Sequence, residues 1–398
     1  MAWPKGKSRK VAESWKVSST DWNDLTRVWD DVDIGAALEG IPHAAQRRWP
    51  LAAVVFLLWR WALEGGRKSF EGALESCWPL LGEVFANSGK PLAAEPVTAT
   101  ALGQARELLG AEPLKRMLRV GTEKALKRFD SLARWRGRRL WALDGSTIRL
   151  FPSAALRESF GGPSTDQGHT VYPCMRVAAL DLVNLGWIAA ALPARYGRSE
   201  ISLGRELTSC LRSGDVFLAD RQFFDTGWWW NLVNRGVDFL IRVKSNRLLS
   251  LMDDDQKRIE AARRAGNGAT DWDVQLRISA AARKEYSEAP GALAVRYIEI
   301  PRPGAEPLLF MTTLSREQLP VEEAQALYRR RWEEETEWRY LKGANHIHLI
   351  QSRKKVTAEQ EFWLHILAHN SVRWAHGEAC LRARSRSLSP RKLFRACG

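Results

Sequence analysis

Short apolar strands alternate with amphipathic helices across residues 171–243, and this alternation restricts the fold more than any other feature of the sequence. Residues 171–196 contain two strand-like runs joined at residues 184–186, a glycine-containing connection typical of an antiparallel hairpin. The pattern then continues as helix, strand, helix and strand at residues 200–214, 216–220, 225–236 and 237–243. Strands separated by helices usually pair in parallel, so this part of the chain predicts an α/β sheet with one antiparallel hairpin.

Changes in composition and hydrophobic periodicity divide the rest of the chain into domains. We expect a mostly helical N-terminal domain, the first part of a mixed core, a β-rich insertion, a helical second part of the core and a basic C-terminal tail, at residues 1–130, 131–245, 246–317, 318–380 and 381–398. The pattern of residues 321–342 predicts one uninterrupted helix that ends at Gly343.

The charge balance narrows the class of partner. The chain carries 60 lysine and arginine residues against 46 aspartate and glutamate residues, a net charge of +14. This surplus favours a polyanion, either nucleic acid or an anionic membrane. No apolar stretch reaches the roughly 20 residues of a spanning helix, and no apolar signal region follows the N-terminus, so we expect a cytoplasmic protein with no membrane contact. The five cysteines form no CxxC pair, which argues against a disulfide framework and a thiolate zinc site.

Two aspartates close apolar strands in the predicted sheet. Asp144 follows an apolar run and precedes the small pair Gly145 and Ser146, and Asp220 ends the run at 216–220. A carboxylate in this position costs free energy to desolvate unless it is exposed, paired or metal-bound, so the two strand ends invite the hypothesis of one shared site. For either residue alone, a turn or a helix cap is the commoner role.

A third group of charged residues lies on the helix predicted for residues 321–342. Four residues share about 60° of one helix face, at i, i+3, i+7 and i+14: Tyr328, Arg331, Glu335 and Lys342. The alternative is a solvated face held by salt bridges, the usual fate of charged helix residues. Trp332 lies near Tyr328 on the same helix and could stack on an extruded base, although core packing explains it equally well.

Three smaller clusters favour structural roles. His365 and His369 are one helical turn apart but have no second ligand cluster, so we expect helix packing rather than zinc binding. The acidic run 253–255 predicts a solvated turn, and the tryptophans at 228–230 predict helix packing.

Phosphodiester chemistry requires this combination of groups. Two divalent cations about 3.5–4 Å apart activate the attacking oxygen and stabilise the leaving one, and Mg²⁺ prefers carboxylates, water and phosphate oxygens as ligands. Asp144, Asp220 and Glu335 would supply the carboxylates. The cations on the helix face would bind phosphate oxygens outside the metal shell.

At these residues the sequence resembles the IS4-type DDE transposases of bacterial insertion sequences. The family signature Tyr-x₂-Arg-x₃-Glu-x₆-Lys is met without a gap by Tyr328, Arg331, Glu335 and Lys342, and the common Trp after the Arg is met by Trp332. The segments around Asp144 and Asp220 resemble those that carry the first two family aspartates. The resemblance extends over residues 98–374, the majority of the chain.

The resemblance implies a ribonuclease-H-like core, in which the two aspartate strands are adjacent and the glutamate helix packs beside them. The resemblance also implies that Asp144, Asp220 and Glu335 are catalytic and hold two Mg²⁺ ions, with Mn²⁺ as a substitute. The helical content of residues 1–130 suits binding of the DNA ends. Tyr328, Arg331, Trp332 and Lys342 would bind DNA. The expected partners are double-stranded DNA at the inverted repeats and the target, with a dimer assembled on the DNA ends.

Three functions are compatible with these features. The first is a transposase that cuts the inverted-repeat ends of its own element and joins them to target DNA. The second is a related endonuclease that does not join strands. The third is an inactive descendant that binds transposon ends, although the three carboxylates favour an active site.

Overall fold

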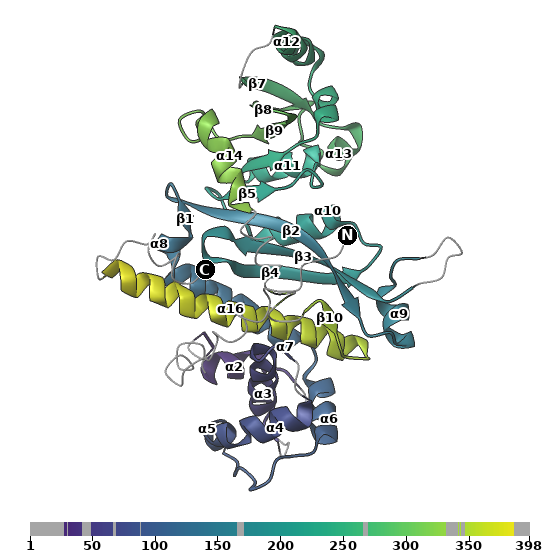
Figure 1. Ribbon diagram of the computed structural model, residues 1–398, viewed down its shortest axis with the longest axis vertical. Helices are drawn as coiled ribbons and strands as arrows, with labels where there is room; N and C mark the ends of the chain where they lie inside the picture. Colours follow the sequence, from purple (N-terminus) through teal and green to yellow (C-terminus); the bar gives the residue numbers. More distant parts are fainter. Residues whose placement is uncertain are drawn as a thin grey trace.

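The computed structural model describes residues 28–29, 31–41, 49–66, 69–87, 89–164, 171–265, 270–331, 341, 343 and 347–385 of the 398. A mixed sheet crosses the middle of the molecule, with a bundle of N-terminal helices on one side and an extension of the sheet on the other (Figure 1). The strands are β1 (Arg134–Trp135), β2 (Arg138–Leu150), β3 (Cys174–Leu182), β4 (Trp187–Arg195), β5 (Val216–Ala219), β6 (Asp238–Arg242), β7 (Thr270–Arg277), β8 (Ala292–Arg302), β9 (Ala305–Thr312) and β10 (Leu349–Ile350).

The strand order explains how the sheet is built. The described strands run β4-β3-β2-β5-β6-β9-β8-β7, with β1 and β10 also pairing with β2. Strands β2, β3 and β4 are antiparallel neighbours, whereas β2, β5 and β6 are parallel to one another. The mixed α/β fold is therefore confirmed, and the two strands that lead to Asp144 and Asp220 are adjacent, as a ribonuclease-H-like core requires.

The predicted hairpin is present and lies at one edge of the sheet. Strands β3 and β4 are joined by a short 3₁₀ turn (Val183–Leu185) and by Gly186, whose φ of 59° is left-handed and costs a glycine little. The backbone N–H of Ile188 donates to Oδ1 of Asn370, and Nδ2 of Asn370 donates to the Ile188 carbonyl. Asn370 thus supplies the buried strand with the hydrogen bonds that a further strand would make.

Alternation along the strands gives the sheet two different faces. Ala142, Leu218 and Leu240 lie in one buried cluster with Leu327 and Tyr328, which belong to helix α14 (Val321–Arg329). The opposite face packs against α10 (Glu200–Leu207) and α11 (Thr226–Asn234), and the predicted packing role of the tryptophans is confirmed because two of them are buried there. Helix α14 and the helix pair α10 and α11 therefore enclose the central strands from both sides.

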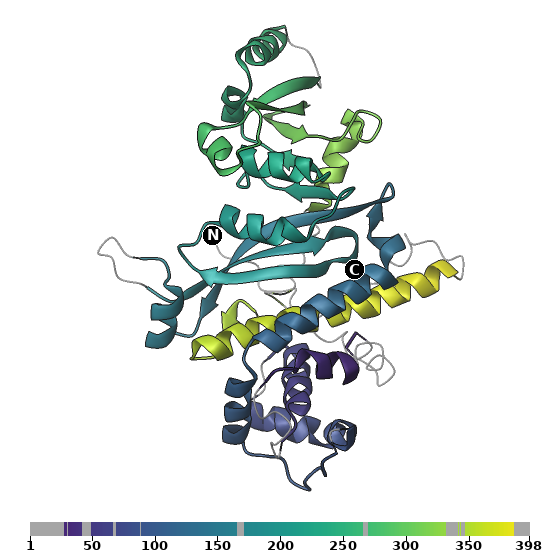
Figure 2. The same cartoon turned by 180° about the vertical axis from the view of Figure 1, so that it is seen from behind.

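The N-terminal region consists of helices, as its periodicity predicts. They are α2 (Asp31–Ala37), α3 (Leu51–Leu63), α4 (Phe70–Cys77), α5 (Gly82–Asn87), α6 (Ala99–Leu109), α7 (Glu112–Arg128) and α8 (Asp130–Ala133). Helix α7 runs beside the long helix α16 (Lys355–Ser385) under the sheet (Figure 2). The buried Arg106 of α6 donates hydrogen bonds to Gln360 Oε1 and Ser352 Oγ, which ties the helical region firmly to the sheet region.

The β-rich segment continues the main sheet instead of forming a separate one. Strand β9 pairs antiparallel with β6, and β8 and β7 follow outward. The segment also contains α12 (Asp253–Arg264) and α13 (Ala280–Glu285). The predicted solvated turn at residues 253–255 is wrong. These acids form the first turn of α12, where carboxylates interact favourably with the helix dipole, and Asp255 Oδ2 accepts the Gln275 N–H.

The single helix expected over residues 321–342 is interrupted. Helix α14 ends at Arg329, and the Arg330 N–H bonds to the carbonyl of Leu327, which tightens the last turn toward 3₁₀ geometry.

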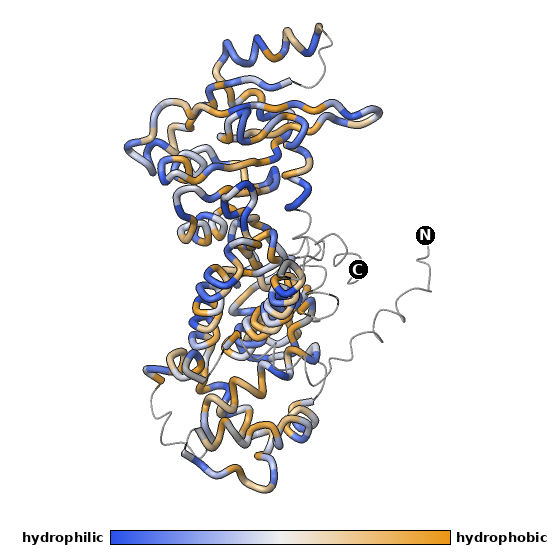
Figure 3. The backbone as a smooth tube through the Cα atoms, turned by 90° about the vertical axis from the view of Figure 1, so that its left-hand side faces the viewer, coloured by the Kyte–Doolittle hydropathy of each residue, from blue (hydrophilic) through white to orange (hydrophobic). Residues whose placement is uncertain are grey.

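At the other end of the chain, residues 381–385 of the expected basic tail belong to α16, and residues 386–398 lie outside the described ranges. Hydrophobic and hydrophilic residues are interleaved throughout the tube in Figure 3, and no helix within the described ranges is long and apolar enough to cross a membrane.

Candidate active site

Asp144 lies in the middle of β2. The prediction that it ends its strand is wrong, because β2 remains paired antiparallel with β3 as far as Arg149 opposite Cys174. Only the parallel pairing with β5 stops early, at Ala142 opposite Leu218. Asp144 therefore lies where β2 loses its neighbour on one side, and its side chain is 22 % exposed. This opening makes the carboxylate accessible although the strand continues.

Asp220 directly follows β5, as the sequence predicts. The register that pairs Ala142 with Leu218 places Asp144 and Asp220 at equivalent positions two residues further along. Neighbouring strands are about 4.8 Å apart, and equivalent positions point to the same face. The Gln222 N–H donates to Asp220 Oδ1 at 2.7 Å, which fixes the turn after the strand. The structure thus brings the two aspartates together on the face that α14 covers.

Tyr328 and Arg331 approach this pair from the helix side. Arg331 is only 4 % exposed, and its Nη1 lies 4.0 Å from Asp144 Oδ1. Its Nε donates to the Tyr328 hydroxyl at 3.2 Å, and its guanidinium lies over the Tyr328 ring, 5.4 Å from the centroid. Tyr328 itself packs against Phe310 of β9. The phenol therefore orients a buried cation toward the carboxylate on β2.

The electrostatics of Tyr328 connect the phenol to Asp220 and to two cations. Burial raises the pKa of the phenol, and the positive charge of Arg331 counteracts that rise. Asp220 also raises the pKa of Tyr328, and Arg242 lowers it. The phenol therefore stays protonated at neutral pH, and its pKa responds to the charges of Arg331, Asp220 and Arg242.

Arg242 is a residue that the sequence analysis missed. It ends β6, and the register that pairs Ala219 with Ile241 places it beside Asp220. Its side chain is half-buried and makes no hydrogen bond or ion pair to another residue of the described ranges. The alternation of side chains along β6 could have identified it. Leu240 faces the same cluster as Tyr328, and Arg242, two residues further along, points to the same face of the sheet. Asp144, Asp220 and Arg242 thus occupy neighbouring positions across the parallel strands β2, β5 and β6.

The remaining predicted site residues are not part of this geometry. Trp332, Glu335 and Lys342 lie outside the described residues. Within the described ranges, no group of three His, Cys, Asp or Glu side chains is close enough to hold a metal ion. Asp144 and Asp220 provide hard oxygen ligands at an accessible position, which fits Mg²⁺ as part of a larger ligand set.

His365 and His369 pack in the core of the molecule. Both are buried on α16, and Nε2 of His369 lies 2.9 Å from the Gly186 carbonyl at the β3–β4 connection. Complete burial lowers the pKa of His369 to about 3, so the ring remains neutral. The predicted packing role of this pair is consistent with these contacts.

Comparison with known proteins gives three findings. The family model described as the transposase DDE domain matches residues 135–371. The chain is 25 % identical over 283 residues to transposase InsG for insertion sequence element IS4 of Escherichia coli strain K12, a match that covers 70 % of this chain and 61 % of the relative. It is 31 % identical over 147 residues to the putative transposase InsZ of the same strain, covering 35 % of this chain and 47 % of the relative.

Among solved structures, the piggyBac transposase synaptic complex with hairpin DNA is similar with a TM-score of 0.45 and 10 % sequence identity, covering 93 % of this chain and 76 % of that chain. The chain spans about three fifths of the length of InsG and about half of the length of InsZ.

Proposed function

The chain belongs to the transposase DDE-domain family, and on that premise we propose that it is a DNA transposase that cuts the inverted-repeat ends of its own insertion sequence and joins them to target DNA. The observation that carries the proposal is the equivalent placement of Asp144 and Asp220 on adjacent parallel strands, with the buried Arg331 4.0 Å from Asp144. A pair of carboxylates beside an oriented guanidinium suits a phosphodiester held against hard cations.

The metal ligands would be Asp144, Asp220 and Glu335. When bound, two Mg²⁺ ions, or Mn²⁺ in their place, would polarise the phosphodiester and neutralise charge on the attacking and leaving oxygens. The half-exposed Asp220 and the accessible Asp144 leave room for a hydrated cation and for substrate.

The other residues of the site would recognise and orient DNA. Arg331 and Arg242 would donate hydrogen bonds to non-bridging phosphate oxygens from opposite sides of the aspartate pair, and Tyr328 would keep the Arg331 guanidinium in position. Lys342 would bind a neighbouring phosphate, and Trp332 would stack on a displaced base.

The reaction proposed is two successive displacements at phosphorus. Water first attacks the phosphodiester at the element end, the bond to the 3′ oxygen breaks, and a free 3′-OH results. That hydroxyl then attacks a phosphodiester of the opposite strand or of the target, releasing a second 3′-OH. Double-stranded DNA is therefore the partner, and we expect a dimer on paired ends that acts in the cytoplasm on chromosomal or plasmid DNA.

The test is metal-dependent cleavage of a duplex that carries the terminal inverted repeat of the element. Asp144→Asn, Asp220→Asn and Glu335→Gln are each expected to abolish nicking in Mg²⁺ and in Mn²⁺ while DNA binding persists. Asp254→Asn, which changes an exposed carboxylate on α12, is the matched control and should cleave normally. Full activity in any of the three site variants would reject the assignment.

A second assay separates the proposed transposase from its alternatives. A pre-cleaved end with a free 3′-OH is incubated with a second duplex, and joined product is measured. Nicking without joining would indicate an endonuclease. Salt-sensitive, sequence-specific end binding with no product in either metal would indicate an inactive end-binding protein.

A further inference from the structure

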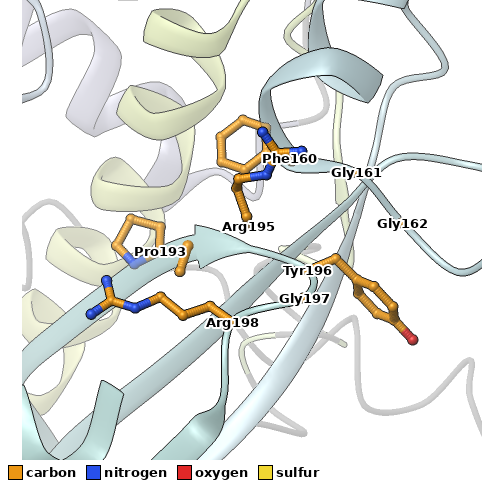
Figure 4. Close-up of a pocket in the computed structure, with 9 residues that line it drawn as sticks. Phe160, Gly161, Gly162, Pro193, Arg195, Tyr196, Gly197 and Arg198 are labelled. Carbon is orange, nitrogen blue, oxygen red and sulfur yellow. The ribbon is translucent and has the colours of Figure 1, made fainter. Parts of the chain in front are cut away.

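Strand β4 is an edge strand, and two surface hollows lie along it. One, of about 510 Å³, is lined by residues 189–193 together with parts of α7, α16, β2 and the segment 210–215. The other, of about 640 Å³, is lined by residues 193–198 and by the end of α9 (Ala154–Phe160), and Figure 4 shows its lining. Pro193 lines both hollows, and we call the two together the β4 groove. Residues 189–195 of β4 contribute to the lining, which is about 20 Å of strand at about 3.3 Å per residue.

Cations outnumber acids along the β4 groove. Its basic lining residues are Lys115, Arg119, Arg139, Arg195, Arg198 and Arg212, against the acids Glu123, Asp215 and Glu359. Arg139 and Arg198 are neutralised by Asp130 and Glu206. Arg119, Arg195 and Arg212 are exposed, and their guanidinium groups make no hydrogen bond or ion pair to other residues of the described ranges. Three exposed guanidinium groups that form no ion pair in the described ranges suit a polyanion.

The surfaces between these cations admit an oxygen-rich ligand. In the second hollow, Gly161, Gly162 and Gly197 present backbone without side chains, and Tyr196 points away from the other labelled residues (Figure 4).

The β4 groove is separate from the aspartate pair. Trp141, which lines the first hollow, and Asp144 are three residues apart on β2, so their side chains point to opposite faces of the sheet. The reacting phosphodiester at Asp144 cannot occupy the groove as well. A ligand of the groove is therefore a different stretch of polyanion.

We propose that the β4 groove binds the sugar–phosphate backbone of duplex DNA away from the reacting phosphodiester, through Arg119, Arg195 and Arg212. This inference rests on the proposed function for the identity of the polyanion and adds a second DNA-contact surface to it. Arginine contacts of this kind neutralise phosphates and release counterions, so the contribution of the groove is independent of base sequence and dependent on salt.

The experiment measures how the affinity for DNA depends on salt. The full-length chain is titrated with a 30-base-pair duplex of random sequence, without divalent metal, between 50 and 200 mM KCl. Each phosphate contact contributes about 0.9 to the slope of log affinity against log salt. The triple variant Arg119→Gln, Arg195→Gln, Arg212→Gln is expected to lose about two to three from that slope and to bind at least about 10-fold more weakly at 100 mM KCl.

A control variant that loses the same number of positive charges elsewhere separates the effect of the groove from the effect of net charge. Lys257→Gln, Arg283→Gln, Lys284→Gln removes three exposed cations on α12 and α13, which do not line the groove, and should leave the slope unchanged. A wild-type slope in the groove variant, or an equal loss in the control, overturns the proposal. Melting temperatures close to wild type confirm that the variants are folded.

A cleavage assay distinguishes failure of this proposal from failure of the proposed function. At saturating protein, the groove variant should still nick an inverted-repeat duplex, because Asp144 and Asp220 are unchanged. If the carboxylate variants retain nicking, the proposed function fails while the salt slope still decides whether the groove binds DNA.

Discussion

Nη1 of Arg331 lies 4.0 Å from Oδ1 of Asp144, so a residue just past the end of α14 and a residue in the middle of β2 form one charged pair. The guanidinium is nearly inaccessible to solvent, whereas the carboxylate is partly exposed. A buried cation in this arrangement is oriented before substrate arrives, and electrostatic catalysis depends on such preorganisation.

Arg331→Lys is expected to lower the single-turnover rate of Mg²⁺-dependent end cleavage by about 10- to 100-fold, and Arg331→Ala by more. Lysine keeps the charge but cannot present the planar fork or the Nε donor that Tyr328 accepts. Arg329→Lys, at an exposed neighbouring position, is the control. Equal rates for Arg331→Lys and wild type would show that the orientation of the guanidinium does not contribute.

Arg242→Gln is expected to reduce cleavage by about 10-fold or more, because the variant loses a cation beside Asp220 that would contact a phosphate oxygen. Lys244→Gln removes an equal charge two residues further along the chain from an exposed position, and should cleave like wild type. The pKa of Tyr328, followed by ultraviolet difference titration, should rise in Arg242→Gln because Arg242 lowers it in the wild type. An unchanged rate together with an unchanged titration would remove Arg242 from the site.

Gly145→Ala is expected to destabilise the protein by about 1–3 kcal/mol and to reduce cleavage, because a Cβ at this position would lie 2.6 Å from the Glu200 carboxyl carbon. Glu200 cannot easily move, since its Oε1 accepts a hydrogen bond from Arg176 at 2.6 Å. The displaced backbone would carry the adjacent Asp144 with it.

The second variant for this test is Gly145→Ala with Glu200→Ala, which makes room for the methyl group. It should recover most of the stability in urea unfolding and part of the cleavage rate. A single variant as stable as wild type would mean that the contact with Glu200 relaxes without cost.

His369→Gln is expected to flatten the acid dependence of stability. The pKa of His369 is about 3 in the folded state and near 6.5 in the unfolded state, so its neutral form stabilises the fold fully above pH 6.5. That contribution is lost as pH falls from 6.5 toward 3, at about 1.4 kcal/mol per pH unit.

Urea unfolding at pH 7.0, 6.0 and 5.0 checks this prediction. The free energy of unfolding of wild type should fall by about 2 kcal/mol more than that of His369→Gln over this range. Parallel pH profiles for the two proteins would contradict a buried neutral imidazole at this position.

The sequence by itself determined most of the local elements and predicted the residues of the site. Periodicity of two and of about 3.6 placed the β3–β4 hairpin, β5, α11 and β6, because burial of one face imposes that spacing on neighbouring residues. The same reasoning selected Asp144 and Asp220 as carboxylates on apolar strands and predicted that Tyr328 and Arg331 face the same way. Those positions depend only on neighbours along the chain.

Tertiary structure decided what local spacing cannot encode. The continuation of β2 past Asp144 depends on pairing with β3, and the approach of Arg242 to Asp220 depends on the register between β5 and β6. The insertion lengthens the main sheet only because β9 pairs with β6. Strand pairing and register are set by contacts between segments that are distant in the sequence. The free energy of these contacts comes from burying side chains of several elements together. A short stretch of sequence therefore does not determine the pairing or the register.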